Sequence, residues 1–477
     1  MWKKRMKSDG SDNTKEIIGV MVLFVSIFLA MIGYLSYFVA TNEQEMINNS
    51  YNSRQKIILA KNYRGSIYSA DGEVLAETVF TSDGKEKRNY PYKNMFSHVI
   101  GFSTYGRTGV EAASNYYLIN SNISLKDKVA NTTAGVKNPG DNVFTTLNTK
   151  LQQAAYNALG VYQGAVIVTE CSTGRVLAMV SKPDFDPNEI ADIWDMVAAD
   201  TESSVLLNRA TQGIYPPGST FKMITALQYI RENPDTYSNY TYTCKGSYKY
   251  EGHTIQCYHG SVHNKVDFVK SFAKSCNTSF VNIGMELDKG GFASTLEQLL
   301  FNQDLKLDFA TAKSKTPVSS DMSQETMLQV SIGQGAVQVS PIHLNMITAA
   351  IANNGMLMKP YIVDYIQSAT GTMVQDYKDK EYGRLMSEEE SSILRKMMIE
   401  VVENGTANRM LGYGYTAGGK TGSAEYNSNR DSHAWFTGFA PAENPEIAIT
   451  IIIEGAGSGG DYAVPMARRI LDAYFKE

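Results

Sequence analysis

The pattern of apolar and polar positions divides the chain into parts of different character. Residues 17–40 form an apolar run of 24 residues without a charged side chain, long enough to cross a hydrocarbon core of about 30 Å. A polar, tyrosine-rich stretch follows up to about residue 140, and the remainder mixes helical and strand periodicities. The pattern therefore predicts a tail (1–16), a transmembrane helix (17–40), a small domain (41–140) and a large domain (141–477).

The charges around the apolar run predict its orientation. Lys3, Lys4, Arg5 and Lys7 precede the run, and positively charged flanks stay on the cytoplasmic side of a membrane. The run is longer than the apolar region of a cleaved signal peptide and is not closed by an Ala-x-Ala site, which favours an anchor. We therefore expect a single-pass protein of the cell membrane, with a cytoplasmic N-terminus and both domains outside the cytoplasm.

The large domain has the signals of an α+β fold. Two apolar runs, Gly164–Thr169 and Val176–Val180, flank a Ser-Thr-Gly turn and predict two antiparallel strands. Further along the chain, residues 434–439 and 447–453 are strand-like, and residues 464–474 have a helical pattern. These elements predict an antiparallel sheet with flanking helices.

The small domain offers weaker signals. Residues 41–61 predict a stalk or a juxtamembrane helix, and Asp71-Gly72 and Asp83-Gly84 predict turns between short strands. The boundary to the large domain is expected near residues 139–141, just before a strand-like run at 143–147.

Three short motifs in the large domain carry the candidate chemistry: Ser219-Thr-Phe-Lys222, Ser275-Cys-Asn277 and Lys420-Thr-Gly422. A Pro-Pro-Gly break precedes Ser219, so Ser219 is expected to open a helix and to share a face with Lys222. The Lys222 amine can then take the proton of the Ser219 hydroxyl, and unpaired N–H groups at the helix start favour developing negative charge.

Each motif alone is a weak signal. Ser-x-x-Lys occurs four times and Ser-x-Asn three times in this chain, whereas Lys-Ser/Thr-Gly occurs only at Lys420. The order of the three motifs along the chain and their sequence context distinguish them from chance matches. The pair Ser271 and Lys274 lies in a predicted helix and is interpreted as ordinary helix surface.

The motifs and their surroundings resemble the class B penicillin-binding proteins. The resemblance rests on the following segments: Tyr215-Pro-Pro-Gly-Ser-Thr-Phe-Lys222, Ser275-Cys-Asn-Thr-Ser-Phe280, Gly333-Gln-Gly335, Lys420-Thr-Gly-Ser-Ala424, Ala434–Pro441, Arg64-Gly-Ser-Ile67 and Gly109-Val-Glu111. It implies a serine β-lactamase/transpeptidase-like domain on a smaller, dimerisation-like pedestal domain, preceded by one transmembrane helix.

The resemblance implies a peptidoglycan D,D-transpeptidase that needs no metal and no organic cofactor. Charge and geometry then suggest a role for each motif: Ser219 as nucleophile, Lys222 as base, Ser275 as proton relay, Asn277 for a substrate carbonyl, and Lys420, Thr421, Gly422 and Ser423 for the substrate's carboxylate and backbone. The family also implies an oxyanion hole made by the backbone N–H groups of Ser219 and Ser423.

The expected partners are peptidoglycan stem peptides, β-lactam antibiotics, other cell-wall or division proteins and the membrane. A SEDS-type glycan polymerase is also expected, because the motifs provide a single serine centre and no glycosyltransferase domain. Two other classes stay open: a class D-like serine β-lactamase or β-lactam sensor, and a catalytically idle scaffold. The net charge of −5 offers no basic footprint for nucleic acid, which excludes that partner.

The cysteines raise the question of a metal. Cys244, Cys257, His259 and His263 cluster in the sequence, and the two histidines have a ligand-like spacing. The two cysteines, however, enclose twelve residues, and zinc sites usually begin with two cysteines two to four positions apart. An exported domain instead favours a disulfide between Cys244 and Cys257. Cys171 and Cys276 are expected to be buried free thiols.

Overall fold

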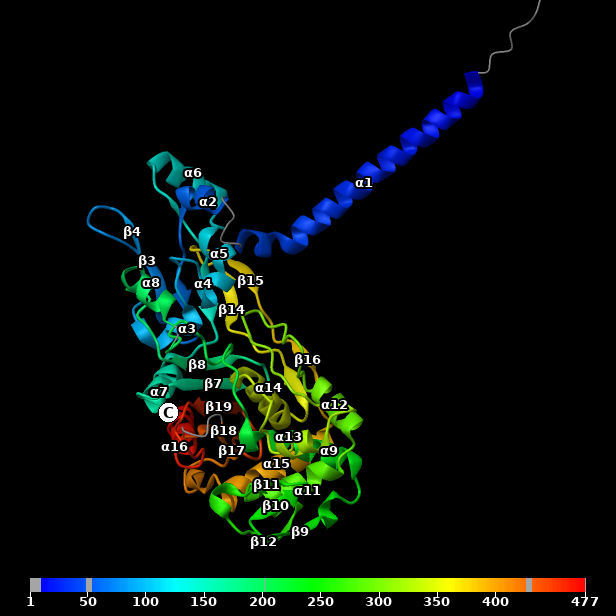
Figure 1. The fold of residues 1–477 in the computed structure, drawn as a ribbon. Helices are drawn as coiled ribbons and strands as arrows, with labels where there is room; N and C mark the ends of the chain where they lie inside the picture. Colours follow the sequence, from blue (N-terminus) through cyan, green and yellow to red (C-terminus); the bar gives the residue numbers. More distant parts are fainter. Residues whose placement is uncertain (1–9, 49–53, 201, 426–430, 477) are drawn as a thin grey trace, which may run out of the picture. The chain divides into compact units, whose positions relative to one another are not determined.

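A computed structural model describes residues 10–48, 54–200, 202–425 and 431–476 (Figure 1). The chain forms two compact units, residues 1–58 and 59–477. The first contains helix α1 (Gly10–Asn48), in which Lys15–Phe38 is long and apolar enough to cross a membrane. The apolar residues of this window are exposed, as expected of a segment that faces lipid. The anchor predicted for 17–40 therefore lies within one long helix that continues beyond it.

A five-stranded antiparallel sheet forms the centre of the second unit. Its strand order is β17 (Gly418–Ala424), β18 (His433–Ala440), β19 (Ile447–Ile453), β7 (Gly164–Glu170) and β8 (Val176–Lys182). Helices α7 (Thr149–Leu159) and α16 (Ala463–Phe475) contact each other and cover one face, and α14 (Pro341–Ala352) packs on the other (Figure 1). Strands β18 and β19 are buried along their whole length, which explains their nearly continuous apolar sequences. The predicted hairpin, the late strands and the last helix are confirmed.

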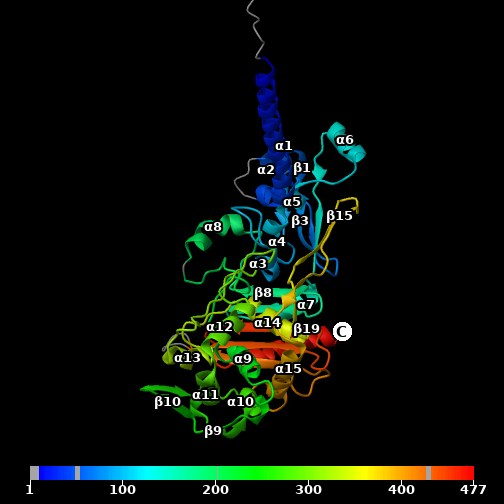
Figure 2. The ribbon, with the colours of Figure 1, turned by 90° about the vertical axis from the view of Figure 1, so that its right-hand side faces the viewer.

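Several further helices of the large domain lie near β17. The short 3₁₀ helix η2 (Gly218–Phe221) runs directly into α9 (Lys222–Glu232), beside α11 (Asn277–Glu286) and α15 (Glu388–Glu403) (Figure 2). Ser219 thus lies in a 3₁₀ turn rather than in the first turn of an α-helix. Because residues three apart eclipse each other in a 3₁₀ turn, Ser219 and Lys222 still share one side.

The second sheet combines distant parts of the chain. Its six strands follow the order β15 (Met373–Asp376), β14 (Val363–Gln367), β6 (Asn142–Thr145), β2 (Ile67–Tyr68), β3 (Val74–Phe80) and β4 (Glu86–Asn89). Figure 1 shows the yellow strands β14 and β15 extending along the blue and cyan segments. Residues from both sides of the boundary predicted near 139–141 therefore share one sheet. The predicted turns are present, with Gly72 and Gly84 at positive φ.

Three sequence segments of the small domain meet at a buried ionic network. The Glu111 carboxylate is completely buried and pairs with Arg64 at 2.5 Å and with Arg88 at 2.7 Å. The Tyr90 hydroxyl donates a further hydrogen bond of 3.2 Å to Glu111. Burial favours the neutral carboxyl and raises its pKa. The positive charges of the two guanidinium groups together outweigh burial and hold the pKa of Glu111 below its ordinary value.

The remaining elements are short. They are α2 (Arg54–Lys61), β1 (Asn62–Tyr63), η1 (Lys93–Phe96), α3 (Ser97–Ile100), α4 (Gly109–Ala113), α5 (Asn115–Ile119), α6 (Leu125–Ala134), β5 (Asn138–Pro139), α8 (Ile190–Ala199), η3 (Tyr237–Asn239), β9 (Thr241–Cys244), β10 (Ser247–Tyr250), β11 (His253–Gln256), η4 (Tyr258–Gly260), β12 (Asn264–Asp267), α10 (Phe268–Ala273), α12 (Lys289–Gln298), α13 (Gln324–Val330), β13 (Met356–Met358), β16 (Glu381–Arg384) and η5 (Asn408–Met410).

Candidate active site

The fold brings the three motifs together around the Ser275 hydroxyl. Lys420 Nζ, on β17, donates a hydrogen bond of 2.9 Å to Ser275 Oγ. Lys222 Nζ, at the start of α9, donates to the same oxygen at 3.3 Å and to the backbone carbonyl of Ser275 at 2.8 Å. Ser275 therefore lies between the two amines, as the motif order predicts.

The two amines are fully buried, and among the described residues neither forms an ion pair. Burial lowers the pKa of Lys222 to about 8, although the neighbouring thiols of Cys276 and Cys257 act in the opposite direction. Burial and the positive charge of Lys222 hold the pKa of Lys420 well below its ordinary value. Two ammonium groups sharing one hydroxyl without a counter-charge are unfavourable, so a neutral amine is available near neutral pH.

Ser219 lies on the turn that precedes α9 and is half-buried. Its hydroxyl forms no hydrogen bond with the described residues, whereas the neighbouring Thr220 hydroxyl donates to Pro217 O at 2.8 Å. The Gly218 N–H donates to Gly333 O at 2.9 Å, and a Cβ at Gly333 would lie 2.2 Å from Gly218 O. The Gly333-Gln-Gly335 segment therefore packs directly against the turn that carries Ser219, Gly218–Phe221, here called the serine turn.

Asn277 links Lys222 to a neighbouring strand. Its Oδ1 accepts a hydrogen bond of 2.6 Å from Lys222 Nζ, and its Nδ2 donates one of 2.8 Å to Gln256 O. The amide was expected to be available for a substrate carbonyl, yet both of its polar atoms have protein partners. One N–H of the amide nitrogen is left for a substrate.

The Lys420 strand lies at the edge of its sheet, as predicted, and its other motif residues have close protein neighbours. The hydroxyls of Thr421 and Thr406 are 2.6 Å apart, and Ser423 Oγ accepts a hydrogen bond of 3.3 Å from the Gly459 N–H. A Cβ at Gly422 would lie 2.9 Å from Pro217 O. Close packing of β17 against the serine turn is thus sufficient reason for a glycine at this position.

Three residues near the motifs were not assigned by sequence reasoning. Thr406 contacts Thr421, Trp435 Nε1 donates a hydrogen bond of 3.0 Å to Pro216 O, and Tyr258 forms a side-chain hydrogen bond with Ser423. Trp435 lies in the segment Ala434–Pro441, one of those that carry the family resemblance, so the sequence already indicated that this region belongs to the site. Thr406 lies in a turn and Tyr258 begins the short 3₁₀ helix η4, neither with a recognisable sequence pattern, and only the fold brings them to the site.

The structure corrects two expectations about residues close to the motifs. Cys244 and Cys257 are free, and their sulfur atoms are 3.7 Å apart, so the expected disulfide is absent. Ser271 is not on a helix surface; it is completely buried and accepts a hydrogen bond of 2.7 Å from the Ser279 hydroxyl. Lys274 is exposed, as expected.

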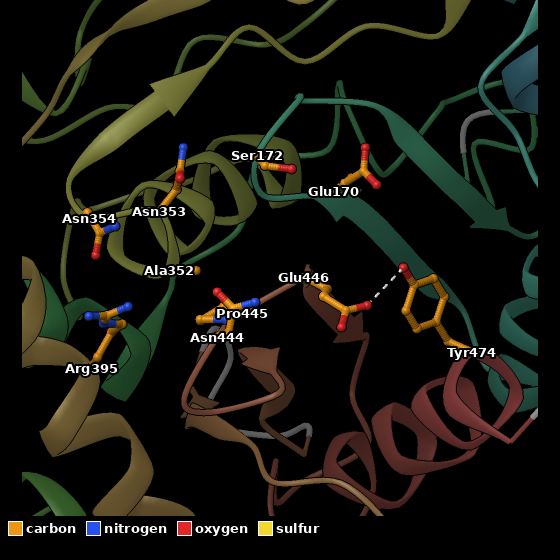
Figure 3. Close-up of a pocket in the computed structure, with 10 residues that line it drawn as sticks. All are labelled: Glu170, Ser172, Ala352, Asn353, Asn354, Arg395, Asn444, Pro445, Glu446 and Tyr474. Atoms are coloured by element: carbon orange, nitrogen blue, oxygen red, sulfur yellow. Dashed lines mark hydrogen bonds between the residues drawn. The ribbon is translucent and has the colours of Figure 1, made fainter.

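A separate polar cleft of about 210 Å³ contains none of the motif residues (Figure 3). Glu170 and Ser172 line it on one side, Asn353 and Arg395 on another, and the Tyr474 hydroxyl donates a hydrogen bond of 3.5 Å to Glu446. Because no nucleophile and base are paired among these residues, the cleft offers no alternative centre for acyl transfer.

The arrangement around Ser275 is that of a serine acyl-transfer enzyme, in which buried amines activate a hydroxyl at the start of a helix. The family model of the penicillin binding protein transpeptidase domain matches residues 164–472, and that of the penicillin binding protein A dimerisation domain matches residues 64–143. The chain therefore belongs to the penicillin-binding protein transpeptidase family.

Individual relatives agree with this assignment. Peptidoglycan D,D-transpeptidase PbpA of Mycolicibacterium smegmatis is 31% identical over 444 residues, which cover 87% of this chain and 89% of that protein. The ceftriaxone acyl-enzyme of penicillin-binding protein A from M. tuberculosis has a TM-score of 0.80 and 29% identity, covering 87% of this chain and 99% of that one. The D,D-transpeptidase domain of a peptidoglycan glycosyltransferase from Eggerthella lenta has a TM-score of 0.79 and 28% identity, with the same coverage of 87% and 99%.

Proposed function

We propose that this protein is a peptidoglycan D,D-transpeptidase, which cross-links stem peptides through a Ser219 acyl-enzyme and is inhibited covalently by β-lactams. The observation that carries the proposal is the Ser275 hydroxyl held between the buried amines of Lys222 and Lys420. Relatives named peptidoglycan D,D-transpeptidase and a structural neighbour trapped as a ceftriaxone acyl-enzyme support it.

The first step forms the acyl-enzyme. Ser219 Oγ attacks the carbonyl carbon of the D-Ala-D-Ala bond, and its proton passes to the neutral amine of Lys222. The C–N bond then breaks, and the terminal D-alanine leaves with a proton that returns through Ser275 and the amines. In the second step, an amine of a neighbouring stem attacks the ester carbonyl, forms the cross-link and releases Ser219 with its proton restored.

The remaining site residues hold the substrate in this proposal. The edge strand β17 pairs with the extended stem peptide through its backbone. The Asn277 amide donates its remaining N–H to a substrate carbonyl, and the hydroxyls of Thr421 and Ser423 bind the carboxylate near Lys420. Gly422 keeps the strand close to the serine turn, and the backbone N–H groups of Ser219 and Ser423 stabilise the oxyanion.

We also propose the membrane topology. A cytoplasmic tail (1–16) and a transmembrane anchor (17–40) precede a pedestal domain (41–140) and a transpeptidase domain (141–477), both on the outer side. The basic residues before the anchor support this orientation. Protease added to spheroplasts tests it: the transpeptidase domain should be cut while an N-terminal tag survives, and the reverse pattern would contradict the topology.

A SEDS-type glycan polymerase is the proposed membrane partner, together with other cell-wall or division proteins. A Cβ at Gly19 or at Gly33 would meet nothing within 4 Å outside the helix itself, so α1 has small exposed positions for a second helix. Replacing residues 17–40 by an unrelated span should abolish co-purification of the polymerase. Unchanged co-purification would reject the anchor as the contact, while the transpeptidase assignment would stand.

The enzymatic proposal is tested by incubating the purified protein with penicillin and with a peptidoglycan stem substrate. Stable acylation and a cross-linked product are expected. Rapid hydrolysis of penicillin would instead indicate a class D-like β-lactamase, stable acylation without cross-linking would indicate a β-lactam sensor, and no labelling would indicate a scaffold.

A further inference from the structure

Three buried cysteines and one histidine converge directly behind the second motif. Cys244 ends β9, Cys257 follows β11, His263 precedes β12, and Cys276 stands between Ser275 and Asn277. The three cysteines are at most 2% exposed, and the four candidate ligand atoms all lie within 4.8 Å of one another.

The distances in this cluster fit four ligands of one ion. Cys257 Sγ lies 3.7 Å from Cys244 Sγ and 3.8 Å from Cys276 Sγ, and Cys244 Sγ lies 3.4 Å from His263 Nδ1. Tetrahedral zinc, with bonds of about 2.3 Å to sulfur and about 2.0 Å to nitrogen, separates two sulfurs by about 3.8 Å and sulfur from nitrogen by about 3.5 Å. A disulfide would need about 2.05 Å between two sulfurs.

We propose that Cys244, Cys257, His263 and Cys276 form a structural zinc site. Binding converts three thiols to thiolates, so that Zn²⁺ enters and three protons leave to solvent while His263 binds through neutral Nδ1. Four protein ligands complete a tetrahedral shell, which leaves no position for water or substrate. The ion therefore organises the fold and takes no part in acyl transfer.

Polar donors around the sulfurs agree with a thiolate site. The Gly246 N–H donates to Cys244 Sγ at 3.4 Å, and the Thr278 hydroxyl donates to the same sulfur at 3.2 Å. Such donors stabilise metal-bound thiolates and orient them. The spacing between Cys244 and Cys257 argues against zinc in the sequence, whereas the contribution of Cys276 depends on the fold.

A zinc ion at this site would cross-link the small strands around it. Residues 241–267 form two separate two-stranded sheets, β9 with β12 and β10 with β11, each with four paired residues. Isolated sheets of this size are marginally stable in water. The buried cluster beneath them consists of the three cysteines with Tyr242 packed against it, while Tyr248, Tyr250 and Ile255 pack against the main core.

The site also positions the second motif. Cys276 is covalently joined to Ser275 and Asn277, and Ser275 has a φ of 53°, which is unfavourable for a residue with a Cβ. Asn277 bonds to the carbonyl of Gln256, the neighbour of Cys257, and also accepts the Lys222 hydrogen bond. Zinc thus fixes Cys276 beside Asn277 and Cys257 beside Gln256, and so holds the Asn277 amide that accepts the Lys222 hydrogen bond.

Metal analysis of the full-length protein, purified in detergent without chelator, tests the site. We expect about one zinc per chain, and cobalt exchanged into the wild type should give a thiolate-to-cobalt charge-transfer band. Cys244→Ser and His263→Ala should weaken zinc binding by about 10-fold or more, whereas the matched control Cys171→Ser, a buried cysteine outside the cluster, should retain it.

A wild-type protein that stays metal-free after dialysis against zinc would overturn the site, whether its four thiols are free or Cys244 and Cys257 are oxidised. The cobalt spectrum is measured on the wild type, so it tests the site even if a variant fails to fold. Removing zinc with a chelator should slow acylation by a fluorescent penicillin, and added zinc should restore it. Acylation that is unchanged by zinc removal would overturn the positioning role. Metal content is measured without a β-lactam, so its outcome is independent of the proposed enzymatic function.

Discussion

Lys420 Nζ donates a hydrogen bond of 2.9 Å to Ser275 Oγ, although 145 positions separate the two residues in the sequence. Lys222 Nζ reaches the same hydroxyl from α9, so one oxygen connects a helix, a loop and an edge strand. The three motifs are thereby coupled, and a change in one of them should alter the protonation of the others.

The roles of the two lysines predict that substituting them lowers the rate of acylation to different extents. Lys222→Ala removes the base and leaves Ser219 without a proton acceptor, so the rate of acylation should fall by about 100-fold or more. Lys420→Arg keeps a positive charge near the substrate carboxylate, so the rate of acylation should fall less. Stopped-flow acylation by a chromogenic cephalosporin measures both. Equal losses in the two variants would argue against this division of roles.

The lowered pKa of Lys222 predicts that acylation becomes faster as the pH rises. With a pKa of about 8, caused chiefly by burial, the amine is mostly protonated below that pH and mostly neutral above it. The rate should therefore rise about tenfold per pH unit below the pKa and level off above it. Lys420→Arg is the control, because an arginine does not titrate in this range. A flat profile across the range would show that no amine of lowered pKa controls the reaction.

The tight contact of Gly422 predicts that even a methyl group there is harmful. The Cβ of Gly422→Ala would lie 2.9 Å from Pro217 O and 3.1 Å from the Thr220 side chain, which forces β17 away from the serine turn. We expect a loss of about 1–3 kcal/mol in stability and slower acylation. Gly414→Ala is a matched control, because a Cβ there meets nothing within 4 Å. Thermal unfolding of the two variants should differ, and equal melting temperatures would disprove the strain.

The Glu111 network predicts a strong effect on the pedestal. Glu111→Gln leaves Arg64 and Arg88 buried without a counter-charge, which typically costs about 3–5 kcal/mol. Asp83→Asn removes an exposed pair with Lys85 in the same domain and should change the stability little, because solvent screens that pair. Urea unfolding measures the difference, and a small effect of Glu111→Gln would mean that the network is not needed for stability.

The elements with local signals were predictable. The apolar anchor, the hairpin β7–β8, the strands β18 and β19 and the helix α16 follow from periodicity and turn residues, because burial on one or both faces fixes which positions are apolar. The three motifs also identified the residues that the fold brings together at Ser275.

Long-range pairing accounts for most of what the sequence did not reveal. Strands β14 and β15 join the pedestal sheet from more than two hundred positions away, and no local pattern encodes that choice. The internal partner of the Asn277 amide is Gln256 O, a backbone atom without a sequence signature. The full cysteine cluster has no sequence signature for the same reason, since Cys276 joins Cys244, Cys257 and His263 only in the folded chain.

Intact-mass spectrometry of the protein after exposure to penicillin tests the assignment of Ser219 most directly. The wild type should gain the mass of one penicillin, and Ser219→Ala should remain unmodified. The variant should lose no more stability than the about 0.5–2 kcal/mol typical of a lost helix cap, because the Ser219 hydroxyl forms no hydrogen bond with the described residues. A penicillin adduct on the folded Ser219→Ala protein would contradict the account.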